Sequence, residues 1–259
     1  MTPPLRLWYN FSRGITQKTE TMDIFTSLAI IAFAALIHAS FQLSVSVLTL
    51  LSSHTIGAKR SRAKLLRLTS SFVGGAALMS LLLLVSAAFV FLQLFGAPVS
   101  LEVWAIACSV VLGIGVAVWL FYYRTKKAGT ELWIPRAFAK HLTSRTKATR
   151  ASVEAFSLGL TSVISELIFI IPTLTISALI LLELPSQWQL VGALVYTLVS
   201  SLGLIVVWSL VGSGHSISRV QKWREKNKRF LQFSAGSALV ALGFFIYINE
   251  VVALATGAL

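Results

Sequence analysis

Two ionisable side chains interrupt long apolar stretches of the sequence, and each has a polar neighbour at helical spacing. His38 is followed by Gln42 four residues later, and Glu166 is preceded by Ser162 four residues earlier. Side chains four positions apart in an α-helix project from the same face. An imidazole and a carboxyl can each take up and release a proton, and together they can bind a cation. The chemistry that this pattern indicates is proton or cation binding inside a membrane.

The two polar stripes also share one register. The steps are 4, 3 and 4 residues in both, through His38, Gln42, Val45 and Thr49 in the first and through Ser162, Glu166, Phe169 and Thr173 in the second. Pro172 lacks a backbone donor and clashes with the carbonyl of Ile168, which predicts a kink beside the second stripe. The sequence therefore predicts a substrate or ion pathway lined by His38, Gln42, Glu166, Ser162 and Pro172.

The same residues also have a purely structural interpretation, and the sequence leaves both open. Ionisable groups inside a membrane span are costly and generally mark functional sites, so Glu166 should be protonated, paired or in contact with water. Alternatively, His38 and Glu166 only hold neighbouring helices together, through hydrogen bonds that stabilise membrane proteins by about 0.6 kcal/mol each on average.

Other kinds of chemistry find no support in the sequence. Cys108 is the single cysteine, so neither an intramolecular disulfide nor a redox pair of thiols can form. Zinc-protease, nucleophile-elbow, Walker and dinucleotide-binding motifs are absent. We expect no enzymatic activity, no cofactor and no metal site.

The composition shows what must position these side chains. Of the 259 residues, 56% are hydrophobic and 12% are charged, which is far more apolar than a soluble domain. A membrane-spanning helix needs about 20 apolar residues. Six runs without lysine or arginine are long enough, at Ile24–Ser52, Leu68–Gly96, Val103–Tyr123, Ala151–Leu182, Leu190–Val211 and Phe230–Ile248. The predicted fold is an all-α integral membrane protein of six transmembrane helices.

Basic residues predict the orientation of these helices. Segments 59–67, 124–150 and 219–229 carry 19 of the 22 lysines and arginines. Loops rich in these residues remain in the cytoplasm, so both termini are expected outside, in a multi-pass protein of the plasma (cell inner) membrane. The basic loops would lie against the anionic lipid of the cytoplasmic leaflet, and no nucleic-acid partner is needed to explain the positive charge.

The chain divides into a leader and two halves. Residues 1–22 lack apolar periodicity and are predicted to be a disordered leader, with Met22 as a second candidate start. A six-helix domain, 23–259, follows, with halves 23–124 and 151–259 joined by the basic cytoplasmic loop 124–150. Because each half has three spans, a 3+3 repeat relating them would be inverted, as in many secondary transporters.

Two segments within this 3+3 arrangement carry a resemblance to a known family. They are GAKRSRAKLLRLTSSFVGG (57–75), after the first helix, and KRFLQFSAGSALVALGFFIY (228–247), in the last. Through them the chain resembles the six-helix lysine-exporter superfamily, which includes the transmembrane domain of the cytochrome c biogenesis reductant transporters. Those transporters carry a cysteine in helices one and four, whereas the corresponding stretches here are IHASFQLSVS (37–46) and SELIFIIP (165–172). Electron transfer is therefore not implied.

The predicted function is a small secondary transporter or exporter of an ion or small solute, with proton coupling at Glu166. The alternative is a non-transporting membrane assembly or scaffold protein, in which the basic loops recruit partners. The sequence identifies neither the substrate nor the oligomeric state.

Overall fold

The computed structural model describes residues 24–41, 44–57, 62–122, 144–146, 148–213, 223 and 226–256. The predicted leader 1–22 with its candidate start Met22, the predicted site residue Gln42 and most of the basic loop 124–150 lie outside these described residues. Within them, every regular element is a helix and no strand occurs, which confirms the predicted all-α class.

The helices follow the predicted apolar runs. In chain order they are α2 (Ile24–Phe41), α3 (Ser44–Gly57), α4 (Arg62–Phe95), α5 (Leu101–Ala117), the π-helical η1 (Val118–Tyr122), α7 (Ser152–Ile164), α8 (Leu167–Glu183), α9 (Ser186–Ser200), α10 (Leu202–Gly212), α12 (Lys228–Ile246), the π-helical η2 (Tyr247–Val252) and α13 (Ala253–Thr256). Among the described residues, four helices are long and apolar enough to cross a membrane, and six if each of two bent pairs counts as one span. By length and composition, the chain thus has four to six helices able to span a membrane, which indicates a membrane protein.

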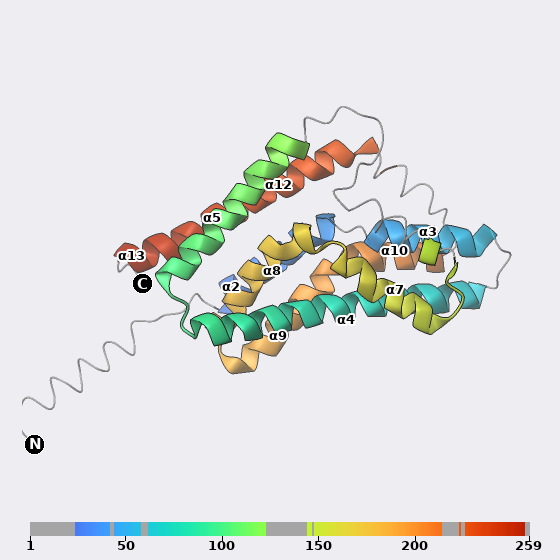
Figure 1. The fold of residues 1–259 in the computed structure, drawn as a ribbon, viewed down its shortest axis with the longest axis horizontal. Coiled ribbons are helices and arrows are strands. Elements are labelled where there is room, and N and C mark those ends of the chain that lie inside the picture. Colours follow the sequence, from blue (N-terminus) through green and yellow to red (C-terminus); the bar gives the residue numbers. More distant parts are fainter. Residues whose placement is uncertain are drawn as a thin grey trace, which may run out of the picture.

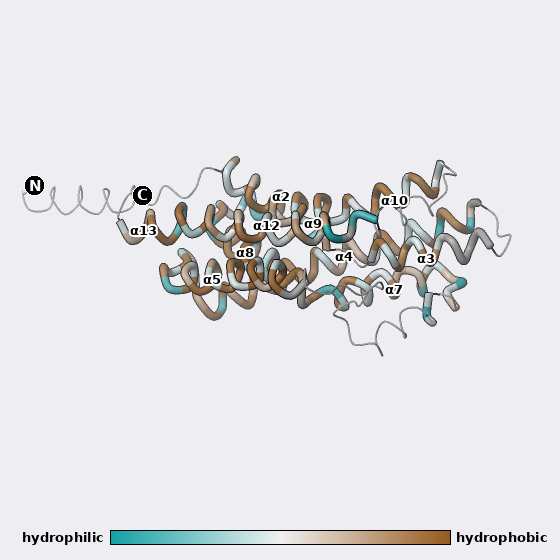
Figure 2. Tube along the Cα trace, turned by 90° about the horizontal axis from the view of Figure 1, so that it is seen from above, coloured by the Kyte–Doolittle hydropathy of each residue, from teal (hydrophilic) through white to brown (hydrophobic). Residues whose placement is uncertain are grey.

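The helices form an elongated bundle with two different ends (Figure 1). At one end lie the start of α2, the turn from α4 to α5, the turn from α8 to α9, and α13; we call this the turn end. At the other end α4 and α7 begin and α10 ends, and we call it the basic end because Arg62, Lys64, Arg67 and Arg150 lie there. Hydrophobic residues cover the bundle along most of its length (Figure 2). Phe25, Phe89 and Ile106 are 78%, 60% and 65% exposed, as expected for side chains that face lipid.

Two of the predicted spans are bent rather than straight. The axis turns by 86° between Ser152–Ile164 and Phe169–Glu183, and by 52° between Ser186–Ser200 and Leu202–Gly212. Hydroxyl groups at both breaks bind backbone oxygens of the preceding turn, from Ser165 to Ser162 and from Ser200 to Thr197. Such bonds compete with the helical ladder and bend helices. The predicted spans at Ala151–Leu182 and Leu190–Val211 therefore each consist of two helices joined by a bend.

The kink predicted at Pro172 is also misplaced. Pro172 lies inside α8, and the sharp bend precedes that helix, at Ser165 and Glu166. Pro172 cannot donate to the oxygen of Ile168, four residues earlier in α8, yet the sharp bend does not lie there. Pro172 is therefore not the position of the sharp bend. The bend does fall beside the polar stripe that contains Glu166.

Two glycines give α4 and α7 the closest contact in the bundle. A methyl group added to Gly75 would lie 2.2 Å from the backbone oxygen of Phe156, and one added to Gly159 would lie 2.2 Å from that of Phe72. Each glycine therefore faces the backbone of the other helix. Small residues at helix crossings are the usual means of close packing in membranes.

Candidate functional site

The structure brings His38 and Glu166 together, one from each predicted half of the chain. Nε2 of His38 lies 3.9 Å from Oε2 of Glu166, and both side chains are completely buried. His38 belongs to the last turn of α2, and Glu166 lies in the break between α7 and α8. The distance exceeds that of a hydrogen bond but allows a strong electrostatic interaction in a medium of low dielectric constant.

Packing between α2 and α8 holds the two side chains in place. The rings of Phe41 and Phe169 are stacked, with centroids 5.9 Å apart and planes at 15°. Each phenylalanine follows the ionisable residue of its own segment by three positions, Phe41 after His38 and Phe169 after Glu166. The backbone oxygen of Glu166 accepts hydrogen bonds from the amides of Phe169 and Ile170, at 2.8 and 3.2 Å. The bend therefore ends with Glu166 fixed at the start of α8 and directed at α2.

Tyr196 on α9 completes the cluster, and the sequence analysis missed it. Its hydroxyl oxygen lies 2.9 Å from Nδ1 of His38, and the tyrosine is completely buried. Thr173 follows on α8, with Oγ1 3.5 Å from the Tyr196 oxygen. A tyrosine in a membrane span usually lies at the interface with water. Its position well inside the fifth apolar run, far from either end, was the signal available in the sequence.

These contacts allow His38 to carry its proton on either ring nitrogen. If the Tyr196 hydroxyl donates to Nδ1, the imidazole carries its proton on Nε2 and directs it at Glu166. If Nδ1–H donates to the Tyr196 oxygen, the tyrosine proton can turn to Thr173, whose own hydroxyl donates to the oxygen of Ile170 at 2.8 Å. Both tautomers are then accommodated. The Tyr196 hydroxyl can thus pair with either tautomer of His38.

The remaining predicted residues lie around this cluster rather than in it. Ser162 is completely buried on α7, before the bend, and its hydroxyl donates to the oxygen of Gly159 at 2.7 Å. Pro172 is buried in α8, next to Thr173. Gln42 lies outside the described residues. The group that the structure assembles is therefore His38, Glu166, Tyr196 and Thr173.

The cluster has too few ligands of the usual kinds for a transition-metal site. Among the residues that the structure describes, no three histidines, cysteines, aspartates or glutamates come together in a group that could hold a metal ion. One carboxyl, one imidazole and two hydroxyls suit a proton or a weakly bound cation.

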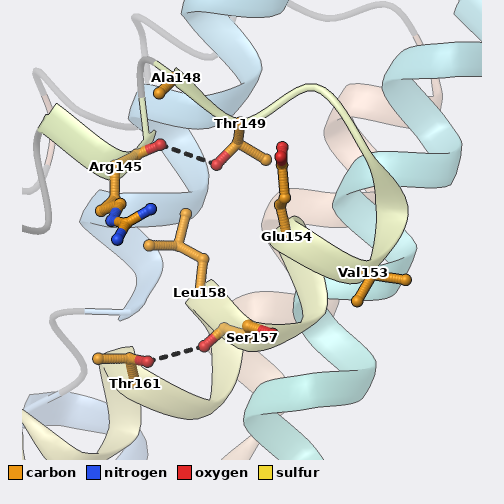
Figure 3. A pocket seen from close by; sticks show the side chains of 8 residues that line it. All are labelled: Arg145, Ala148, Thr149, Val153, Glu154, Ser157, Leu158 and Thr161. Carbon is orange, nitrogen blue, oxygen red and sulfur yellow. Dashed lines mark hydrogen bonds between the residues drawn. The ribbon is translucent and has the colours of Figure 1, made fainter.

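A separate pocket opens at the basic end, beside the first turns of α7 (Figure 3). Its volume is about 420 Å³, and its lining combines charged and hydroxyl side chains with an apolar floor at Leu158. None of the four residues of the His38 cluster lines it. The structure thus contains two polar sites at different levels of the bundle.

Comparison of the chain with protein-family models, with curated proteins and with solved structures found no match. The resemblance to the lysine-exporter superfamily stays a prediction, and the function has to be argued from the chain itself.

Proposed function

We propose that this protein is a small secondary transporter of an ion or small solute, coupled to protons at His38 and Glu166. The observation that carries the proposal is the meeting of these two ionisable side chains, fully buried and 3.9 Å apart, beside a bend of 86°. Transporters place their coupling sites at broken helices between two halves of the fold. Here the acid comes from the break in the second half, and the imidazole from the first helix of the other half.

The cost of burying these groups also favours a functional role. Acids and histidines within membrane spans are expensive, face the interior of the bundle and commonly form proton relays. A hydrogen bond between helices stabilises a membrane protein only modestly, and serine, threonine or glutamine can provide it without a titratable group. Stability alone is thus a weak reason to retain a buried carboxyl opposite an imidazole.

The proposal includes six spans with both termini outside. Counting each bent pair as one span gives six, and an even number of crossings agrees with Ile24 and Thr256 lying at the same end (Figure 1). The positive-inside rule then places the basic end in the cytoplasm and the turn end outside, in the plasma membrane. The third helix of each half continues into a π-helical segment, η1 after α5 and η2 after α12, which supports an inverted 3+3 repeat.

A proton jump tests the coupling without knowledge of the substrate. Purified protein in liposomes is adsorbed on a solid-supported membrane, and a rapid change of pH should produce a transient current as protons reach the buried site. Glu166→Gln keeps the size and hydrogen-bonding capacity of the side chain but cannot titrate, so it should abolish the transient. The matched control is Glu102→Gln, because Glu102 is an exposed glutamate in the first turn of α5.

The scaffold alternative makes the opposite prediction for the same variants. If His38 and Glu166 only hold helices together, wild-type protein and both variants should give equal currents, at the level of empty liposomes. That result would overturn the proposed function.

A further inference from the structure

The pocket at the basic end carries two opposite charges in its lining. Arg145 and Glu154 both line it, and the Arg145 side chain extends toward its centre (Figure 3). Two backbone hydrogen bonds, from Arg150 and Ala151, lower the pKa of the Glu154 carboxyl, and the positive charges of Arg145 and Arg150 lower it further. Hydroxyl groups of Thr149, Ser157 and Thr161 complete the polar part of the lining. A ligand that carries both a negative and a positive group would match this arrangement.

Backbone amides at the N-terminus of α7 hold the Glu154 carboxylate in place. Oε2 of Glu154 accepts hydrogen bonds from the backbone amides of Arg150 and Ala151, at 2.7 and 3.1 Å. Neither bond uses Oε1. A glutamate that reaches back to the residues before its helix in this way is held in one orientation. One carboxylate oxygen thus caps the helix, and the other stays available to a cationic group.

The hydroxyl groups are partly committed to the backbone. Thr149 donates to the oxygen of Arg145 at 2.8 Å, and Thr161 donates to that of Ser157 at 2.8 Å (Figure 3). Because their hydrogens are used, these two oxygens offer lone pairs rather than donors. Arg145 and the exposed Ser157 are then the side chains of the lining that can donate to an anionic group.

Exposed apolar side chains continue from the rim of the pocket along α7. Val153, at its rim, is 76% exposed, and Ile164, three turns further along α7, is 42% exposed. Residues eleven positions apart lie on nearly the same side of an α-helix. In a membrane protein such an exposed apolar strip contacts acyl chains. A ligand with a polar head in the pocket would therefore have hydrocarbon beside it.

We propose that this pocket binds the headgroup of an amine-bearing glycerophospholipid such as phosphatidylethanolamine. Arg145 and Ser157 bind the phosphate, Glu154 binds the ammonium group, and the acyl chains run along Val153 and Ile164. Arginine suits phosphate because its planar fork donates two parallel hydrogen bonds. The negative charge of Glu154 disfavours a headgroup with a net negative charge. The lipid preference expected of this site therefore differs from that of the basic loops, which attract anionic lipid in general. The inference is independent of the proposed transport activity.

Native mass spectrometry of the full chain in detergent, titrated with dioleoyl phosphatidylethanolamine or dioleoyl phosphatidylglycerol, tests the proposal. Wild-type protein should bind the ethanolamine lipid more tightly. Arg145→Gln should weaken binding of both lipids by at least about tenfold, because a charged hydrogen-bonding partner is lost. Glu154→Gln should weaken binding of the ethanolamine lipid only, because the glutamine amide oxygen can still cap the helix but carries no charge. The matched control is Arg67→Gln, because Arg67 is an exposed arginine of α4 that does not line the pocket.

A second arm separates a lipid from a soluble ligand with the same headgroup. Val153→Asn should weaken binding of the ethanolamine lipid, and free phosphoethanolamine should bind far more weakly than the lipid, because the acyl contacts are missing. Equal effects of Arg145→Gln and Arg67→Gln would overturn the proposal, as would a wild-type preference for phosphatidylglycerol. Binding of phosphoethanolamine as tight as that of the lipid, unchanged in Val153→Asn, would also overturn it in favour of a soluble ligand.

Discussion

The hydroxyl oxygen of Tyr196 lies 2.9 Å from Nδ1 of His38 and so links the fifth apolar run of the chain to the first. This contact suits either tautomer of the imidazole, because the Tyr196 hydroxyl can donate to Nδ1 or accept from it. It is also the contact of the buried cluster that can be removed with the least change of shape, because phenylalanine keeps the ring.

Tyr196→Phe is therefore expected to destabilise the protein modestly and to alter its proton transient. Loss of a hydrogen bond between helices costs about 0.6 kcal/mol on average in membranes, and up to about 1.7 kcal/mol. Unfolding of the purified protein in sodium dodecyl sulfate measures this cost. The matched control is Tyr247→Phe, because Tyr247 is 42% exposed. An equal cost for the two substitutions would contradict the buried contact.

His38 and Glu166 are expected to be energetically coupled. Residues in direct contact typically show coupling energies of 0.5 to 3 kcal/mol, roughly the range expected for this buried pair. A double-mutant cycle with His38→Gln, Glu166→Gln and the combined variant, followed by unfolding at several pH values, measures it. The coupling should change with pH, since it depends on protonation of the pair. Additive effects at every pH would argue against a shared proton.

The α4–α7 crossing should not tolerate a side chain at either glycine. Gly75→Ala and Gly159→Ala would each place a methyl group 2.2 Å from a backbone oxygen, which has to move to make room. Both variants should lose several kcal/mol of stability or fail to accumulate, as overpacked sites do. Size-exclusion chromatography followed by detergent unfolding detects this.

Gly74→Ala is the matched control for these variants, since an added methyl group there would meet nothing within 4 Å. It should be neutral or stabilising by roughly 0.5 to 1 kcal/mol, because alanine favours the helix more than glycine does. If Gly74→Ala and Gly75→Ala behaved alike, the close crossing would be refuted.

Topology is tested with reporters of membrane sidedness. Fusions after Leu142 and after Lys226 should be read as cytoplasmic, and a fusion after Leu259 as external, because basic segments stay inside. Each fusion point lies beyond a different predicted span. A cytoplasmic reporter at Leu259 would rule out six spans with external termini.

The sequence predicted part of this architecture and part of the candidate site. Apolar run length predicted the membrane helices, because a bilayer imposes a length that composition alone reveals. The rarity of ionisable residues in those runs singled out His38 and Glu166. Tyr196 was missed because its role depends on which helices become neighbours, and local spacing carries no such information. The kink predicted at Pro172 was misplaced, and the bend after Ser200 was not predicted. At both bends a serine hydroxyl bonds to the backbone of the preceding turn, and apolar run length does not reveal such bonds.

The glycine contact between α4 and α7 restricts how the buried cluster can be opened. The two glycine contacts pack α7 directly against α4, which is unbroken over 34 residues. On the far side of the bend, α8 packs against both α2 and α4, and Glu166 directly precedes its first residue. The helix α4 therefore contacts the bent span on both sides of its break at Ser165 and Glu166. Any change in the angle of this bend would require α7 or α8 to shift along α4.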